Sequence, residues 1–266
     1  STMQIATDGL VLRQVKVGEA DQILTILTPD HGVLSASARG SLRLKSKLFS
    51  ACGLFCYSEF TITAGRASYF VDTAAVKKVF HGLGRSVEAM ALASYLAEAA
   101  CVLAPEPPES AELLRLLLNS LYMIGENKRP LPLMKAIFEM RASCQAGYMP
   151  RILACESCGR YDGCDFYLDT AGGGLLCADC AASHNRVPNL DAGALYALRH
   201  ICLADDAKLF AFTLSAASTK RLGRVCERYF LANLDRGLKS LDFLHTVLAE
   251  PAPASPTVPS GNEPEV

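Results

Sequence analysis

The chain has 266 residues, half of them apolar, and 26 Lys and Arg side chains stand against 27 Asp and Glu side chains. A net charge of −1 gives no global attraction to nucleic acid or to an acidic membrane, so any basic surface has to be local. No uncharged apolar run reaches the roughly 18 residues that a membrane helix needs. The odd number of cysteines, 11, and the polar start of the chain favour a reducing cytosol over a disulfide-bonded secreted protein.

Residues 9–80 have the pattern of short β-strands. We expect strands over 9–15, 22–28, 33–39, 54–63 and 67–79, separated by turns at 18–21, 29–32 and 64–66. Gly and Pro stand in these turns where tight turns require them. Five strands in about 75 residues suit a small closed barrel, and the OB-fold is the expected architecture.

Charge is unevenly distributed within this β region. Between His31 and Ser58 there is no acidic residue. Cations spaced along a loop can follow a phosphate backbone and release its counterions, so we take this stretch as a candidate DNA-binding surface, supported by a Lys pair in the last strand. The candidate DNA-binding residues are Arg39, Arg43, Lys45, Lys47, Lys77 and Lys78. The alternative is a solvated loop with ordinary basic residues.

The hydrophobic period changes after residue 84. Helices are expected over 86–103, 110–125 and 133–146, with Ser86 as the N-cap of the first. Further helices are expected over 192–203 and 207–214, and a last long helix runs from 218 or 219 to about 248. The stretch from residue 250 is rich in Pro, Ala and Ser, and we expect a disordered tail.

The long last helix carries Arg221, Arg224 and Arg228 at spacings that place them on one helical face. We interpret them as a secondary basic face, which is either a second phosphate contact or the solvent-exposed side of the helix.

Two CxxC pairs lie between the helical segments. Cys155 and Cys158 form the first, Cys177 and Cys180 form the second, and 18 residues separate them. This is the spacing of a four-thiolate zinc site, and four thiolates with no further ligand form a closed, structural site. We therefore expect one structural Zn²⁺. The alternatives are a vestigial set of reduced thiols and a redox pair.

These elements predict an α+β chain in four parts. Residues 1–81 form an OB-fold nucleic-acid-binding domain, 82–150 and 181–249 form an all-helical domain, 151–180 form an inserted zinc ribbon, and 250–266 form the tail. The sequence contains no GxxxxGK[ST], HExxH or GxSxG motif, and its five histidines are scattered. We therefore do not expect an enzyme.

Taken together, these features resemble the RecO family of bacterial recombination mediators. The resemblance is carried by residues 9–12, 18–21, 27–29 and 38–40, and by the order of barrel, helices, four-cysteine ribbon and helices. It extends from about residue 5 to 249. Residues 50–53 depart from the family pattern, because Ser-Ala-Cys-Gly stands where related proteins carry a Leu-Gln-Pro-like segment.

The resemblance implies a non-enzymatic protein of the bacterial cytoplasm, associated with the nucleoid. Such proteins bind single- and double-stranded DNA, anneal complementary strands and help load the RecA recombinase onto protein-coated single strands. The implied partners are RecR and the acidic C-terminal tail of the single-strand DNA-binding protein. Such a tail needs an apolar pocket rimmed by cations, for which the candidates are Lys128, Arg129, Lys135, Arg141 and Arg151. The alternative is a zinc-ribbon adaptor that binds proteins only.

Overall fold

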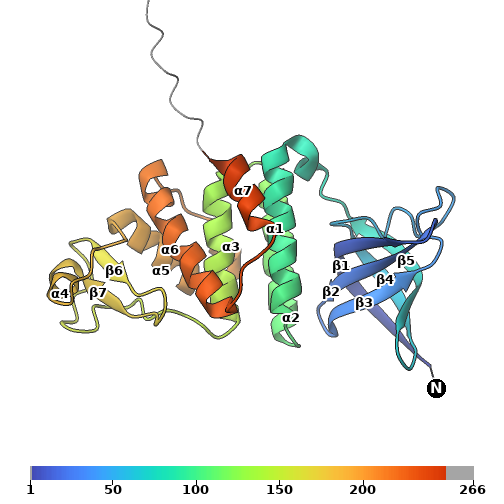
Figure 1. Cartoon of the computed structure of the whole chain (residues 1–266), viewed down its shortest axis with the longest axis horizontal. Helices are drawn as coiled ribbons and strands as arrows, with labels where there is room; N and C mark the ends of the chain where they lie inside the picture. The colour runs from blue at the N-terminus through green and yellow to red at the C-terminus, as the bar shows by residue number, and fades with distance from the viewer. Residues whose placement is uncertain (1, 250–266) are drawn as a thin grey trace, which may run out of the picture.

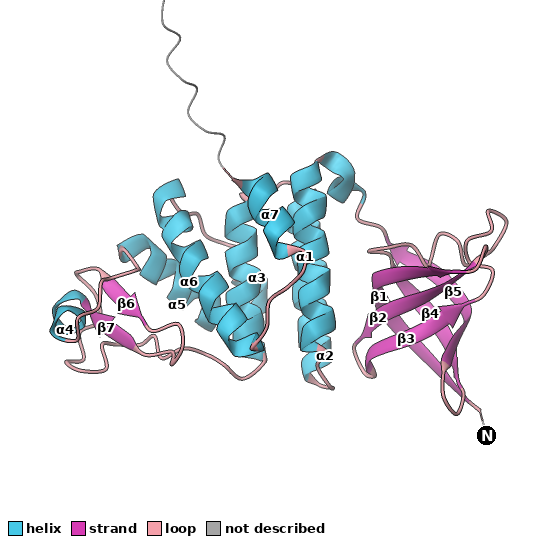
Figure 2. Ribbon diagram, viewed as in Figure 1, coloured by secondary structure: helices cyan, strands magenta, loops and turns pink. Residues whose placement is uncertain are grey.

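The computed structural model describes residues 2–249 and places a β-barrel at one end of an elongated molecule and a small β-ribbon at the other (Figures 1 and 2). A helical domain lies between them. The barrel strands are β1 (Met3–Val17), β2 (Asp21–Thr28), β3 (Gly32–Ala38), β4 (Tyr57–Ala64) and β5 (Tyr69–Lys78).

The five strands close in the order β1-β2-β3-β5-β4, which is the connectivity of an OB-fold. All pairings are antiparallel except the short one between β3 and β5, where Ala36 faces Tyr69. Strand β1 begins at Met3, earlier than predicted, because its first half pairs with β4 while its second half pairs with β2. Alternate side chains such as Ile26 and Phe60 fill the barrel interior. The predicted barrel is confirmed.

The helical domain consists of η1 (His81–Arg85), α1 (Val87–Leu103), α2 (Glu109–Gly125), α3 (Leu131–Gln145), α5 (Ala192–Leu203), α6 (Ala216–Leu234) and α7 (Leu241–Leu248). The Ser86 hydroxyl caps α1 by accepting a hydrogen bond from the backbone N–H of Ala89 at 3.0 Å, as predicted. Asp191 caps α5 in the same way through the N–H of Ala194.

The predicted helix over 207–214 is wrong. Only a short 3₁₀ turn, η2 (Asp206–Lys208), forms there. The carbonyl oxygens of Phe210 and Phe212 accept hydrogen bonds from the Arg129 guanidinium at 3.1 and 3.2 Å, and Phe212 is buried in the helical core. Tertiary contacts therefore satisfy backbone groups that a helix would have paired internally.

The single long helix predicted up to about residue 248 is also wrong. Helix α6 ends at Leu234, and Asp235 adopts a left-handed conformation with a φ of 53°. The chain then turns, and α7 packs against α1 (Figure 1). The carboxylate of Glu98 on α1 holds this turn by accepting a hydrogen bond from the N–H of Ser240 at 3.2 Å.

The four-cysteine ribbon is inserted between α3 and α5. It contains β6 (Phe166–Leu168), β7 (Leu175–Cys177) and α4 (Ala178–Ser183), and its buried side chains join the core of the helical domain. The barrel joins the same core through Leu10, Leu12 and Leu27. The fold class predicted from the sequence is therefore confirmed. None of the described helices is long and apolar enough to cross a membrane.

Candidate nucleic-acid interface and metal centre

The loop between β3 and β4 carries the predicted cluster of cations, which we call the basic loop: Arg39, Arg43, Lys45 and Lys47. All four side chains are exposed, and within residues 2–249 none of them takes part in an ion pair. The loop is nevertheless anchored. The N–H of Leu42 donates to the carbonyl of Ala20 at 2.9 Å, and the N–H of Gly40 donates to the Asp21 carboxylate at 2.6 Å. Four uncompensated cations are thus held on a fixed backbone path.

One of these cations is positioned by an aromatic ring. The guanidinium carbon of Arg39 lies 4.6 Å from the ring centre of Phe70, at the start of β5. This is a cation–π contact, and it orients the guanidinium over the barrel surface.

Sequence analysis missed the barrel surface beside Arg39. In the observed register, Val15, Ile23, Ser37 and Phe70 form one row across neighbouring strands. Val15 and Ile23 remain 40% and 38% exposed there. This row lies on the β2–β3 face that OB-folds use to bind oligonucleotides. The row was hard to foresee because an irregularity in β1 between Val11 and Arg13 shifts which residues point outward.

The structure separates the predicted Lys pair from Arg39. Phe70 and Lys78 lie eight residues apart on β5, which corresponds to about 26 Å at the usual rise of a strand. Lys77 forms an ion pair with Asp8 at 2.7 Å, and this hydrogen bond raises the pKa of Lys77. Lys78 lies over the rings of Phe80 and Tyr122, beside the helical domain. Neither side chain therefore joins the surface around Arg39.

The four ribbon cysteines converge in space as predicted. Their sulfur atoms all lie within 4.8 Å of one another, and the Sγ atoms of Cys158 and Cys177 are 3.7 Å apart. A tetrahedral thiolate site with metal–sulfur bonds of about 2.3 Å would separate its sulfurs by about 3.8 Å. The four donors, Cys155, Cys158, Cys177 and Cys180, are therefore spaced as ligands of one metal ion.

Local backbone structure builds each half of this cluster. Gly159, with a φ of +75°, lets the first CxxC loop turn so that its N–H donates to the carbonyl of Cys155 at 2.9 Å. Cys177 ends β7 and caps α4 by accepting from the N–H of Cys180 at 3.5 Å. Cys164 and His184 lie close in sequence but outside the cluster.

Proton affinities differ sharply within the cluster. Burial would raise the pKa of the Cys155 thiol, but hydrogen bonds from the backbone of Cys177, Cys158 and Ser157 outweigh it and lower the pKa to about 6. The pKa of the Cys180 thiol is raised to about 12. The largest cause is its hydrogen bond with Cys177, and the next largest is its hydrogen bond with Cys155. Four thiols this close cannot all ionise without a cation, so metal binding would release protons.

Comparison with known proteins covers nearly the whole described chain. A family model described as "Recombination protein O N terminal" matches residues 3–80, and one described as "Recombination protein O C terminal" matches residues 85–242. This chain belongs to the RecO family. The predicted family is therefore confirmed, and with it a place in DNA repair and recombination.

Three curated relatives, each named DNA repair protein RecO, match this chain over almost their full lengths. The protein from Acetivibrio thermocellus is 32% identical over 244 residues, which cover 91% of this chain and 97% of the relative. The protein from Symbiobacterium thermophilum is 30% identical over 245 residues, 90% and 96% of the two chains. The protein from Alkaliphilus metalliredigens is 27% identical over 234 residues, 88% and 95% of the two chains.

Three of the five cations proposed to rim an acidic-tail pocket in this RecO chain are engaged elsewhere. Lys135 is buried, and its ammonium group lies between the carboxylates of Glu139 and Glu227 at 3.0 and 2.8 Å, so its assignment to the rim is wrong. Arg141 pairs with Asp206, and Arg129 binds the carbonyl groups of residues 210 and 212. These side chains hold the helical domain together instead.

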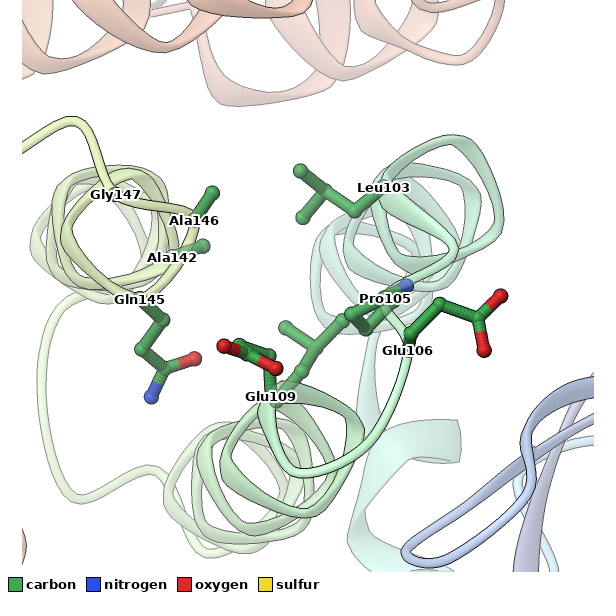
Figure 3. Close-up of a pocket in the computed structure, with 9 residues that line it drawn as sticks. Leu103, Pro105, Glu106, Glu109, Ala142, Gln145, Ala146 and Gly147 are labelled. Atoms are coloured by element: carbon green, nitrogen blue, oxygen red, sulfur yellow. The ribbon is translucent and has the colours of Figure 1, made fainter.

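A pocket of about 350 Å³ does open beside these helices, where the end of α1, the start of α2 and the end of α3 meet (Figure 3). Leu103, Leu113 and Ala142 supply apolar wall, and the Glu109 carboxylate points into the pocket, whereas the Glu106 carboxylate points away from it. A carboxylate that faces the pocket would repel an acidic peptide. This pocket of the RecO fold therefore does not have the charge that the acidic-tail prediction requires.

Proposed function

We propose that this chain is a DNA-binding recombination mediator that binds and anneals DNA and helps load recombinase onto protein-coated single strands. One observation carries the proposal: the basic loop, which follows β3 of the OB-fold, presents four exposed cations that form no ion pair within residues 2–249, and Arg39 among them lies over Phe70 of the barrel. In an OB-fold this face and its loops form the oligonucleotide-binding surface. The family assignment supports the finer roles, including partnership with RecR and with the acidic tail of the single-strand DNA-binding protein.

Counterion release makes the proposal quantitative. Each cation that neutralises a phosphate of single-stranded DNA contributes about −0.7 to the slope of log K against log salt concentration. Four cations therefore contribute up to about −3. The exposed Val15 and Ile23 and the half-buried Phe70 provide apolar surface for bases beside these charges. Lys77, paired with Asp8, contributes less than the basic loop.

The test replaces Arg39, Arg43, Lys45 and Lys47 together by alanine and measures single-stranded DNA binding by fluorescence anisotropy at several salt concentrations. We expect weaker binding and a slope shallower by about 3. The matched control removes the same charge from four exposed lysines of the helical domain, Lys128, Lys208, Lys220 and Lys239. An unchanged slope in the basic-loop variant would refute the assigned surface.

We further propose that the four-cysteine cluster binds one structural Zn²⁺. The tetrahedral sulfur spacing and the closed four-thiolate set support zinc, which such sites favour. The metal would fix the ribbon against the helical core, with which Cys155 and Cys177 already pack. Its role here is stability rather than chemistry.

A protein-only adaptor is the second candidate function, and one observation favours it. Around the groove between the ribbon and α5, Tyr161, Tyr196 and Leu203 are 57%, 63% and 55% exposed, and Arg199 lies 3.9 Å from the Tyr161 ring. Exposed tyrosines beside an arginine are typical of protein interfaces. This hypothesis predicts no DNA affinity even at low salt, so a gel-shift assay at two salt concentrations separates it from the first.

A further inference from the structure

The secondary basic face predicted from the sequence forms one wall of a pocket. Arg221, Arg224 and Arg228 of α6 line a cavity of about 300 Å³, and the ribbon forms the opposite wall through Tyr167 and Thr170. Asn189 also lines the cavity, but its side-chain amide already bonds to the backbone of Leu168. Its Oδ1 accepts from the Leu168 N–H at 2.8 Å, and its Nδ2 donates to the Leu168 carbonyl at 3.0 Å. The wall that faces the arginines is therefore fixed by the ribbon itself.

Most of the positive charge in this pocket is uncompensated. Arg221 faces Asp165, with 3.7 Å between Nη1 and Oδ2, and donates to the carbonyl of Pro188 at 3.0 Å. Arg224 and Arg228 are exposed, and across residues 2–249 they take part in no ion pair. Two guanidinium groups on adjacent turns of one helix are thus available to an anion.

The lining selects the class of anion. Guanidinium groups and the hydroxyls of Tyr167 and Thr170 are hydrogen-bond donors, and a phosphate oxygen accepts from such groups, bidentately from arginine. The apolar side chains behind them, Leu168 and Val225, are only 0% and 2% exposed. An acidic peptide with an apolar anchor would need an apolar floor that it could reach. The pocket is therefore suited to a phosphate group rather than to such a peptide.

We infer that this pocket binds the sugar-phosphate backbone of a second nucleic-acid segment. The inference rests on the proposed function for the class of ligand and adds a second site to it. The pocket lies at the ribbon end of the molecule, whereas the basic loop lies on the barrel at the other end (Figure 1). One chain would then hold two DNA segments apart, one at each end.

The test is a bridging assay in which bead-bound single-stranded DNA captures a labelled, non-complementary strand in the presence of the full chain. Arg224→Ala/Arg228→Ala should reduce capture at least fivefold and leave anisotropy-measured binding of one strand within about twofold. The control, Lys220→Ala/Arg236→Ala, removes the same charge from exposed positions outside the pocket and should capture like the wild type.

Outcomes separate this inference from the proposed function. If the basic-loop variant loses single-strand binding while the pocket variant bridges normally, the pocket assignment is overturned and the proposed function stands. If the control loses capture as strongly as the pocket variant, general charge explains the effect and the pocket is again excluded. If a glutamate-rich peptide displaces the captured strand only from protein with an intact pocket, the ligand is a peptide and the phosphate assignment fails.

Discussion

Glu139 is a fully buried carboxylate at the centre of the helical domain. Its oxygens accept hydrogen bonds from the Tyr95 hydroxyl at 2.7 Å and from the Lys135 ammonium at 3.0 and 3.1 Å. Burial raises the pKa of Glu139 from its ordinary value of 4.5 to about 7, although Lys135 and Tyr95 favour the charged form. Between pH 4.5 and about 7, Glu139 therefore keeps its proton in the folded protein, whereas the unfolded chain has already lost it.

This shift makes stability depend on pH in a stated direction. The proton bound to Glu139 contributes to the free energy of unfolding. This contribution is fully present below about pH 4.5 and is lost as the pH rises through about 7. A difference of this size corresponds to about 3 kcal/mol, at 1.36 kcal/mol for each pH unit. Glu139→Gln removes the titration while it keeps the shape of the side chain. Relative to the wild type, its free energy of unfolding should rise by up to about 3 kcal/mol between pH 4.5 and 8.

Urea unfolding followed by circular dichroism at pH 5, 6, 7 and 8 measures this difference. Glu126→Gln serves as the control for the loss of one carboxylate, because Glu126 is exposed at the end of α2. If the free energies of unfolding of Glu139→Gln and the wild type change with pH in parallel, the reasoning is refuted. Parallel curves would mean that Glu139 has the same pKa in the folded and the unfolded state.

Two further predictions follow from close packing and from the metal site. Cys155→Ser should lower both the zinc content and the melting temperature, while Cys164→Ser, outside the cluster, should leave the zinc content unchanged; one zinc per chain in Cys155→Ser would show that the ligand set is wrong. A Cβ at Gly82 would approach the carbonyl carbon of Gly125 to 2.6 Å, so Gly82→Ala should cost about 1–3 kcal/mol of unfolding free energy, whereas Gly84→Ala meets no atom within 4 Å. Equal stability of the two alanine variants would show that η1 and α2 are not packed this closely.

The sequence could predict those features that depend on neighbouring residues. The Ser86 cap, the turn at residues 29–32 and the convergence of two CxxC pairs each follow from a few adjacent residue types. The basic loop was recognisable because 28 consecutive positions, 31–58, contain no acid. Local chemistry alone determined these features.

What the sequence could not predict depends on contacts between distant segments. Lys135 resembles a surface cation in sequence, but Glu227, 92 residues further on, supplies its second carboxylate. The break after α6 falls at Asp235, where the pattern of apolar residues continues, and Glu98 of α1 stabilises the turn that follows. The pocket beside Arg224 exists only because the ribbon folds against α6.

The central claim is that DNA lies on the basic loop, and the most direct measurement is lysine footprinting. The protein is acylated with a lysine-reactive reagent, with and without single-stranded DNA, and the modified lysines are quantified by mass spectrometry. Lys45 and Lys47 should be protected when DNA is bound, while the exposed Lys128 and Lys208 of the helical domain should react equally in both samples. Equal modification of Lys45 and Lys47 with saturating DNA would contradict the claim.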